Sequence, residues 1–76
     1  MANFTQELDA RNESCPIPVM KTKNALKGMK TGEILHVMTT DPASVQDINF
    51  LMEALKDKLI EAKQNGGEYH FYIKKT

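Results

Sequence analysis

The lone cysteine of this 76-residue chain, Cys15, lies in the segment ESCPIPVMK, where Pro16 follows it directly and Pro18 comes two residues later. A thiol is a strong nucleophile once it ionises. A proline pushes the residue before it into extended backbone geometry, which is also the geometry of a helix N-cap. We therefore expect Cys15 at or beside the start of a helix, with Pro18 in the first turn, where a missing N–H breaks no hydrogen bond.

The positive end of such a helix favours the thiolate by an amount that can be bounded. It stabilises an adjacent anion by about 0.3–1 kcal/mol, and by up to about 2 kcal/mol when the anion is partly buried. Since one pKa unit corresponds to about 1.4 kcal/mol, the pKa of an ordinary thiol falls by about one and a half units at most. This predicts a moderately activated thiolate. A cysteine protease would also need a histidine base, and nothing in the sequence places His36 or His70 beside Cys15.

Other chemistries are excluded by the residues that the chain lacks. A single cysteine forms neither an internal disulfide nor a C-x-x-C redox pair. One cysteine, two separated histidines and no clustered carboxylates make a poor metal site. No glycine-rich loop precedes an expected helix, so we expect no phosphate site, no cofactor and no metal. One accessible thiol can still accept and return a single group, namely a sulfane sulfur, an oxidised sulfur or a mixed disulfide.

The composition describes a small globular domain with no bulk attraction to polyanions. Ten basic and ten acidic residues give a formal net charge of zero, which argues against direct binding of nucleic acid or a membrane surface. The N-terminal segment has no basic leader or apolar run, and no stretch approaches the roughly 20 apolar residues of a membrane span. We expect a cytoplasmic protein, and a monomer, because no long apolar edge demands a partner.

Hydrophobic periodicity and turn residues predict six elements in the order β-α-β-α-β-β within a single domain over residues 1–76. Asn65-Gly66-Gly67 is a strong hairpin turn between the last two strands. The expected elements are a strand over Phe4–Ala10, a helix over Pro16–Lys27 ended by Gly28, a strand over Glu33–Thr40, a helix from the Asp41-Pro42 start to about Lys56, and strands over Lys58–Lys63 and Glu68–Lys74.

The fold class that follows is α/β (α+β), a two-layer sandwich with a mixed four-stranded sheet. Right-handed crossovers place both helices on one face of it. The helix stripes Val19, Thr22, Leu26, Met29 and Val45, Ile48, Leu51, Met52, Leu55 should pack against that face. The opposite face should be largely open, with His70 and Tyr72 exposed on it. Met29, Met38 and Met52 are interpreted as core residues.

Positive charge gathers near the expected thiol, on and beside the first helix. Lys21, Lys23 and Lys27 follow Cys15 along this helix, and Arg11 is the nearest cation before it. Such residues either form a solvated face or steer an acidic partner, and both readings stay open. Met20, about one turn beyond the thiol, is a candidate contact on its rim. Candidate partner-docking residues are therefore Arg11, Met20, Lys21, Lys23 and Lys27.

The segment LDARNESCPIPV resembles the signature of the TusA (SirA-like) family of small sulfur-carrier proteins, which carry C-P-x-P at the start of the first helix. The resemblance extends over the whole chain, through the Leu8-Asp9-Ala10 strand end, the Asp41-Pro42-Ala43-Ser44 helix start and the final strand ending in FYIKK. Many relatives have a glycine where this chain reads Asn12-Glu13. Asparagine tolerates left-handed geometry better than most residues, so we expect the loop to keep its shape.

The resemblance implies sulfur relay. Family members receive a persulfide sulfur on the cysteine that matches Cys15 from a cysteine desulfurase or a rhodanese-type sulfurtransferase. They pass it to a thiol acceptor protein, such as a DsrE-like one, for tRNA 2-thiolation, molybdenum cofactor synthesis or sulfur oxidation. Such a protein is a sulfurtransferase only as a relay, without a free-standing active site. Two alternatives are a regulatory or nucleic-acid-binding module that uses the lysine-rich first helix, and a monothiol redox sensor.

Overall fold

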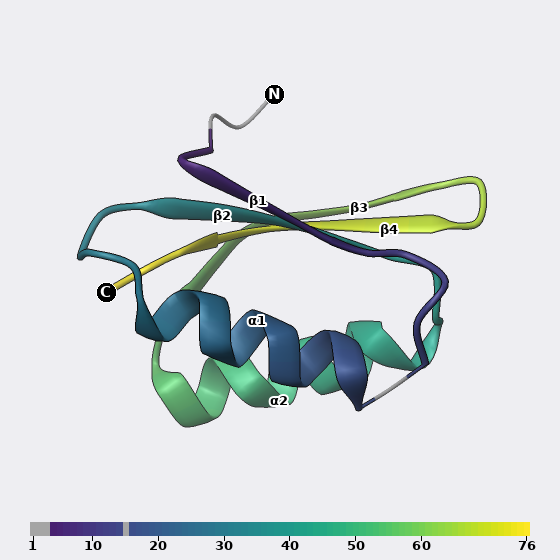
Figure 1. Cartoon of the computed structure of the whole chain (residues 1–76), viewed down its shortest axis with the longest axis horizontal. Helices are drawn as coiled ribbons and strands as arrows, with labels where there is room; N and C mark the ends of the chain where they lie inside the picture. Colours follow the sequence, from purple (N-terminus) through teal and green to yellow (C-terminus); the bar gives the residue numbers. More distant parts are fainter. Residues whose placement is uncertain (1–3, 15) are drawn as a thin grey trace.

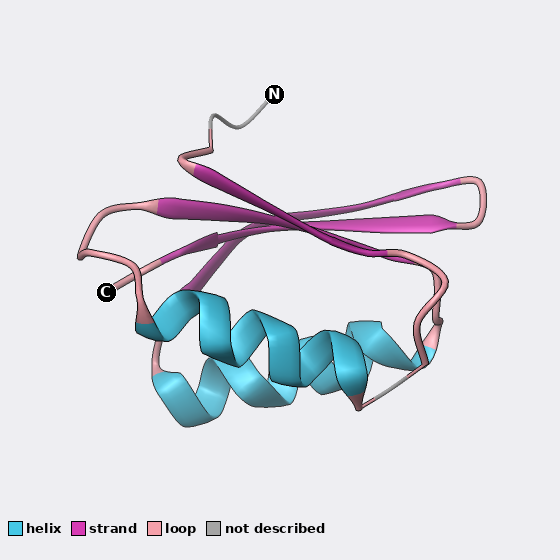
Figure 2. Cartoon of the chain, in the orientation of Figure 1, coloured by secondary structure: helices cyan, strands magenta, loops and turns pink. Residues whose placement is uncertain are grey.

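The computed structural model describes residues 4–14 and 16–76, so the predicted position of Cys15 lies outside the described residues. The two helices lie side by side on one face of a four-stranded sheet (Figures 1 and 2), which confirms the predicted two-layer α+β fold. Along the chain the elements are β1 (Gln6–Ala10), α1 (Ile17–Lys27), β2 (Ile34–Thr39), α2 (Ala43–Leu55), β3 (Lys58–Asn65) and β4 (Glu68–Lys74).

The sheet has the strand order β1-β2-β4-β3. β1 pairs with β2 in parallel, with Ala10 opposite Thr39 at their last residues. The other two pairings are antiparallel. β2 is an interior strand, as its continuous apolar sequence predicts. Because β1 and β2 run the same way, the loops that lead into α1 and α2 leave the same edge of the sheet.

The predicted elements agree with the structure to within a few residues. β3 begins at Lys58 as expected and continues to Asn65, and β4 has the expected bounds. The hairpin turn depends on Gly66, which has a φ of 62°, a left-handed conformation that glycine adopts without steric cost. β1 begins two residues later than expected, at Gln6, where its register with β2 starts opposite Leu35.

The core lies between the helices and the inner face of the sheet. Leu26 on α1 and Ile48 on α2 are both fully buried. They pack with Leu35, Val37, Met29, Leu51, Met52, Phe71 and Ile73. Val19 and Leu55 pack against this cluster as predicted, but the prediction for Val45 is wrong, since this side chain is 36% exposed. Ser44 takes the buried position because its hydroxyl bonds Thr39 Oγ1 at 2.6 Å and Asp41 O at 2.6 Å.

The opposite face of the sheet is covered at its centre, which corrects the prediction for Tyr72 in particular, while residues toward its edges such as Glu7 and Lys63 are exposed as expected. Tyr72 is 6% exposed, because its ring stacks on that of His36 at a centroid distance of 4.4 Å. Phe4, from the segment before β1, covers His36 at 5.1 Å. His70 is only half-buried beside them. Met38 alternates with core residues along β2, so it is buried on this outer face instead of among the core methionines.

The core predicts a steep cost for truncating Leu26. Leu26→Ala removes a fully buried side chain from a domain with little core to spare, and the free energy of unfolding should fall by about 2–5 kcal/mol. Ile60→Ala, at a position that is 41% exposed, should change it by about 0.5 kcal/mol or less. Urea denaturation of both variants measures the difference, and equal losses would contradict this description of the core.

Candidate functional site

The start of α1 is set by two prolines. Pro16 is the N-cap residue, and no side chain caps the helix. The amide of Ile17 donates to Ser14 O at 3.0 Å, which closes a turn of the chain between these residues. Pro18, the second helical residue, is buried, and its carbonyl accepts a hydrogen bond from Thr22 Oγ1 at 2.7 Å. Pro18 therefore anchors the first turn in the core, while Ser14 and Pro16 are both exposed.

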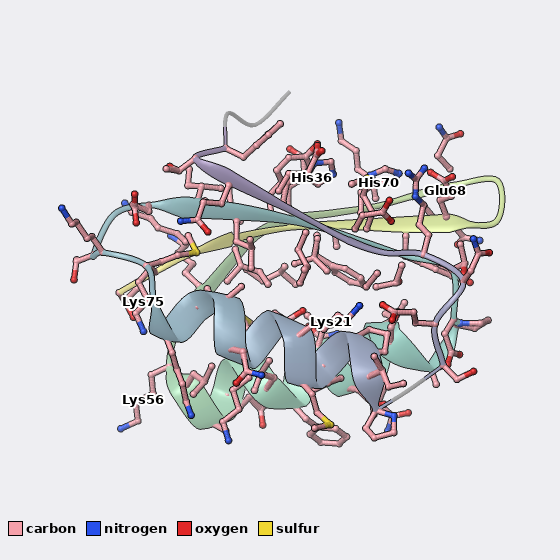
Figure 3. The ribbon with its side chains drawn as sticks, viewed as in Figure 1. Lys21, His36, Lys56, Glu68, His70 and Lys75 are labelled. Atoms are coloured by element: carbon pink, nitrogen blue, oxygen red, sulfur yellow. The ribbon has the colours of Figure 1, made fainter. Side chains whose placement is uncertain are left out.

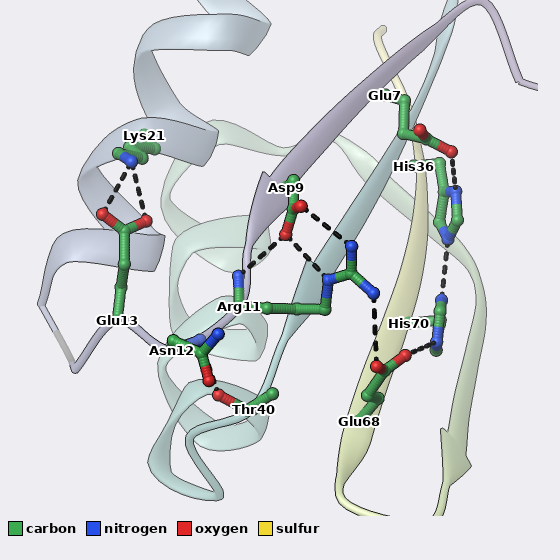
Figure 4. A network of polar contacts seen from close by, with 10 residues as sticks. All are labelled: Glu7, Asp9, Arg11, Asn12, Glu13, Lys21, His36, Thr40, Glu68 and His70. Carbon is green, nitrogen blue, oxygen red and sulfur yellow. Dashed lines mark hydrogen bonds and ion pairs between the residues drawn. The ribbon is translucent and has the colours of Figure 1, made fainter.

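The loop before α1 is held by contacts to two other parts of the chain. Asn12 has a φ of 64°, the left-handed conformation expected for the position where many relatives have glycine. Its backbone N–H donates a hydrogen bond to Thr40 Oγ1 at 2.8 Å, which joins this loop to the loop after β2. Glu13 accepts two hydrogen bonds of 2.7 Å from Lys21 Nζ, which join the loop to α1 (Figure 4). The segment that precedes Cys15 is therefore fastened on both sides.

Arg11 adds a third contact, across the sheet. Its guanidinium makes two hydrogen bonds of 2.9 Å to the carboxylate of Asp9 and one of 3.3 Å to Glu68 Oε2 on β4. The side-chain hydrogen bonds from Arg11, with the backbone hydrogen bond of the same residue, lower the pKa of Asp9 to about 2. The same pairing raises the pKa of Arg11 above its ordinary value. Arg11 thus braces the loop within the protein.

Two shallow hollows flank the start of α1. Charged and polar groups of the loop and the sheet edge line the first, on the side of β1, and apolar groups dominate the second, between the two helices. The lining residues are Asp9, Arg11, Asn12, Glu13, Lys21, Thr40 and Glu68 in the first, and Pro16, Val19, Asp47, Phe50 and Leu51 in the second. A partner that reaches the C-P-x-P segment therefore meets a charged surface on one side and an apolar one on the other.

The candidate docking residues fall into two groups. Met20 is 57% exposed, and the exposed Lys23 and Lys27 form no ion pair within residues 4–14 and 16–76. Arg11 and Lys21, in contrast, are both engaged in ion pairs inside the protein. The sequence prediction missed Phe50, which is 59% exposed beside Pro16. A signal was present, since this large aromatic residue lies outside the apolar stripe of α2.

The histidines are separated from this site by the sheet. His36 and His70 lie on the face opposite the helices (Figure 3), so neither is placed as a base for a nucleophile at the start of α1. Among the residues that the structure describes, no three histidine, aspartate or glutamate side chains are grouped to hold a metal ion. Within the same residues, no helix has both the length and the apolar character needed to cross a bilayer.

Comparisons with known proteins agree with one another. The family model described as "Sulfurtransferase TusA" matches residues 6–75. "Sulfur carrier protein TusA" of Allochromatium vinosum is 45% identical over 76 residues, which is all of both chains. A "putative sulfur carrier protein" of Thermotoga maritima is 41% identical over 92% of this chain and 90% of its own. The crystal structure of a SirA-like protein from Desulfitobacterium hafniense superposes with a TM-score of 0.80 at 25% identity, over 92% of this chain and 96% of that one.

The Asp9–Arg11 pair predicts a measurable titration. Asp9 should titrate at a pKa of about 2, and in Arg11→Gln it should return toward its ordinary value of 3.8. Because the folded-state pKa is lowered, the stabilisation from ionised Asp9 is present above pH 4 and is lost as the pH falls toward 2. NMR titration of the Asp9 carboxyl carbon measures this, with Lys27→Gln as a control that should leave it unchanged. A value near 3.8 in the unsubstituted protein would contradict the pairing.

Proposed function

Because this chain belongs to the TusA family, we propose that it is a sulfur carrier in which Cys15 holds one sulfane sulfur as a persulfide and passes it to an acceptor protein. The observation that carries the proposal is the 45% identity to a sulfur carrier over the full length of both chains. It is supported by the position of the only thiol of the chain, directly before the N-cap Pro16 and directly after the exposed Ser14.

The transfer is an exchange at sulfur that needs no cofactor. The thiolate of Cys15 attacks the outer sulfur of a donor persulfide, a new S–S bond forms, and the old S–S bond breaks with its electron pair leaving on the donor thiolate. Unloading repeats the step, with an acceptor thiolate attacking the outer sulfur on Cys15. Each step forms one S–S bond and breaks another, so there is no net oxidation or reduction and no external oxidant or reductant is required. A thiolate also needs no base, in agreement with histidines that lie on the far face of the sheet.

The structure supports a role for the loop in presenting the thiol. Three contacts hold the segment before Cys15, namely Arg11 to Asp9 and Glu68, Asn12 to Thr40, and Glu13 to Lys21. On the other side, the buried Pro18 fixes the first turn of α1. Because the residues before and after Cys15 are held in this way, they lose little conformational entropy when a partner docks, and such positioning is worth several kcal/mol in favourable cases.

The docking surface that we propose extends from the start of α1 along the exposed face of this helix. Met20 and Phe50 supply exposed apolar area, and beside it Lys23 and Lys27 supply positive charge that no described residue pairs with. A partner with an apolar contact and an acidic rim fits this surface. Arg11 and Lys21 contribute only where a partner carboxylate replaces the internal one. A cysteine desulfurase or rhodanese-type donor and a thiol acceptor such as a DsrE-like protein are the partner classes, and the protein acts as a cytoplasmic monomer.

Loading of Cys15 tests the function directly. Incubation with a cysteine desulfurase and cysteine, or with a rhodanese and thiosulfate, should add one sulfur atom to the protein by mass spectrometry, and a reducing thiol should remove it. Cys15→Ser should gain nothing, while Ser14→Ala should be loaded like the unsubstituted protein. The proposal fails if the native protein gains no sulfur or if the added mass persists in Cys15→Ser.

Charge reversal on α1 tests the docking surface. Lys23→Glu combined with Lys27→Glu should lower the loading rate at low salt by about tenfold, because steering of an acidic partner is lost. Lys56→Glu combined with Lys75→Glu carries the same charge change outside α1, at the C-cap of α2 and just after β4 (Figure 3), and should have little effect. Equal slowing by both pairs would show that net charge acts, not this surface. Stopped-flow loading at two ionic strengths measures the rates.

A further inference from the structure

The outer face of the sheet carries a continuous chain of polar contacts that the proposed sulfur transfer does not use (Figure 4). Glu7 Oε2 lies 3.2 Å from His36 Nδ1, and His36 Nε2 lies 2.9 Å from His70 Nδ1. His70 Nε2 lies 3.2 Å from Glu68 Oε1, and the other oxygen of Glu68 lies 3.3 Å from Arg11. The chain of contacts has five side chains, which come from β1, β2, β4 and the loop after β1. It connects His36, at the centre of this face, to the segment that precedes Cys15.

The number of protons in this chain of contacts follows from its chemistry. An ionised carboxylate only accepts hydrogen bonds, so His36 Nδ1 must carry a proton to bind Glu7, and His70 Nε2 must carry one to bind Glu68. Two neutral imidazoles have no further proton. Their remaining nitrogens would then face each other at 2.9 Å with one lone pair each. A third proton between them completes all three hydrogen bonds, and it makes the histidine pair a single cation.

The charges around the pair favour that cation. The groups that face it are Glu7 and Asp9 from β1, Arg11 from the following loop, Glu68 and Tyr72 from β4, and Glu61 and Lys63 from β3, where they pair at 2.7 Å. Glu7 and Glu68 contact the pair directly, whereas Asp9 and Glu61 are each paired with a cation, and Lys58 and Lys74 lie farther along the same face. The ring of Tyr72 stacks on His36 at 4.4 Å, and the face of an aromatic ring attracts a cation at this distance. Both acidic and aromatic neighbours therefore stabilise one added positive charge.

Glu68 transmits the charge state of the pair to the loop. Its two oxygens are divided between His70 and Arg11, so it is shared by two cations while the third proton is present. When that proton leaves, two N–H groups remain for three contacts, so one ring must turn or change its tautomer and release a partner. The side chain of His70 is 20% exposed and that of His36 is 8% exposed, so His70 is the ring with room to move. Glu68 then loses one of its two partners, and the brace on Arg11 changes.

We propose that His36 and His70 together form a one-proton site whose occupancy regulates the loop that precedes Cys15. Loss of the proton changes the contacts of Glu68 and Arg11, and residues 12–14 move in response. In the protonated state, Asn12 is bonded to Thr40 and Glu13 to Lys21. The proton site itself is independent of sulfur chemistry. Its consequence, a pH-dependent presentation of the thiol to partners, rests on the proposed sulfur-carrier function.

NMR titration from pH 9 to pH 6 tests the site in Cys15→Ser protein, where no thiol ionises. The ring nitrogens of His36 and His70 should report one shared step that takes up a single proton, leaving three of the four nitrogens protonated. The amides of Asn12, Glu13 and Ser14 should shift with the same midpoint. Two separate steps, one for each ring, would overturn the one-proton site. A shared step with stationary loop amides would overturn its coupling to the loop.

Three variants locate the coupling. His70→Gln should abolish the shared step and the movement of the loop amides together. Glu68→Gln should keep a proton-uptake step at the histidines but remove the response of the loop. Glu53→Gln, an exposed charge-matched change on α2, should preserve both. Because every measurement is made without a thiol, failure here leaves the sulfur-carrier proposal standing, and failure of sulfur loading leaves this result unaffected.

Discussion

Parallel pairing of β1 with β2 is the constraint on which the arrangement of this protein depends. It brings Ala10 opposite Thr39, so two loops that are far apart in the sequence leave the sheet together. Only then can the amide of Asn12 reach the hydroxyl of Thr40 at 2.8 Å. Each such hydrogen bond adds only about 0.5–1.5 kcal/mol to stability. Its greater effect is on position, since it holds the segment before the C-P-x-P motif against the rest of the domain.

The loop before α1 combines rigidity with access, which is what a carrier requires. A sulfur carrier exchanges one atom with two proteins in turn and performs no chemistry on a bound small molecule. It therefore needs an exposed nucleophile and a surface that different partners can share. The buried Pro18 supplies an anchor below the exposed Ser14 and Pro16, and Met20 and Phe50 supply apolar surface beside them. A deep pocket or a neighbouring base would serve an enzyme better than it would serve a relay.

Local features of the structure followed from the sequence, and contacts across the sheet did not. Turn residues and alternation gave β4 with its observed bounds, and the type of residue 12 anticipated its left-handed backbone. The contact of Arg11 with Glu68 joins residues that are 57 positions apart, and no spacing rule reports it. The sequence shows the charges near the motif, but it does not show that Arg11 and Lys21 pair inside the protein. The covered centre of the outer face escaped prediction for the same reason, because Phe4 reaches His36 only after the strands pair.

A sulfur-transfer experiment with an isotopic label tests the central claim most directly. Cys15 loaded with one heavy sulfur atom is mixed with a reduced DsrE-like acceptor protein, and both proteins are weighed by mass spectrometry over time. If Cys15 is the relay position, the label leaves this chain and appears on the acceptor in a one-to-one ratio, with no free sulfide. Label that stays on Cys15, or that escapes as sulfide at the same rate with and without the acceptor, would contradict the account.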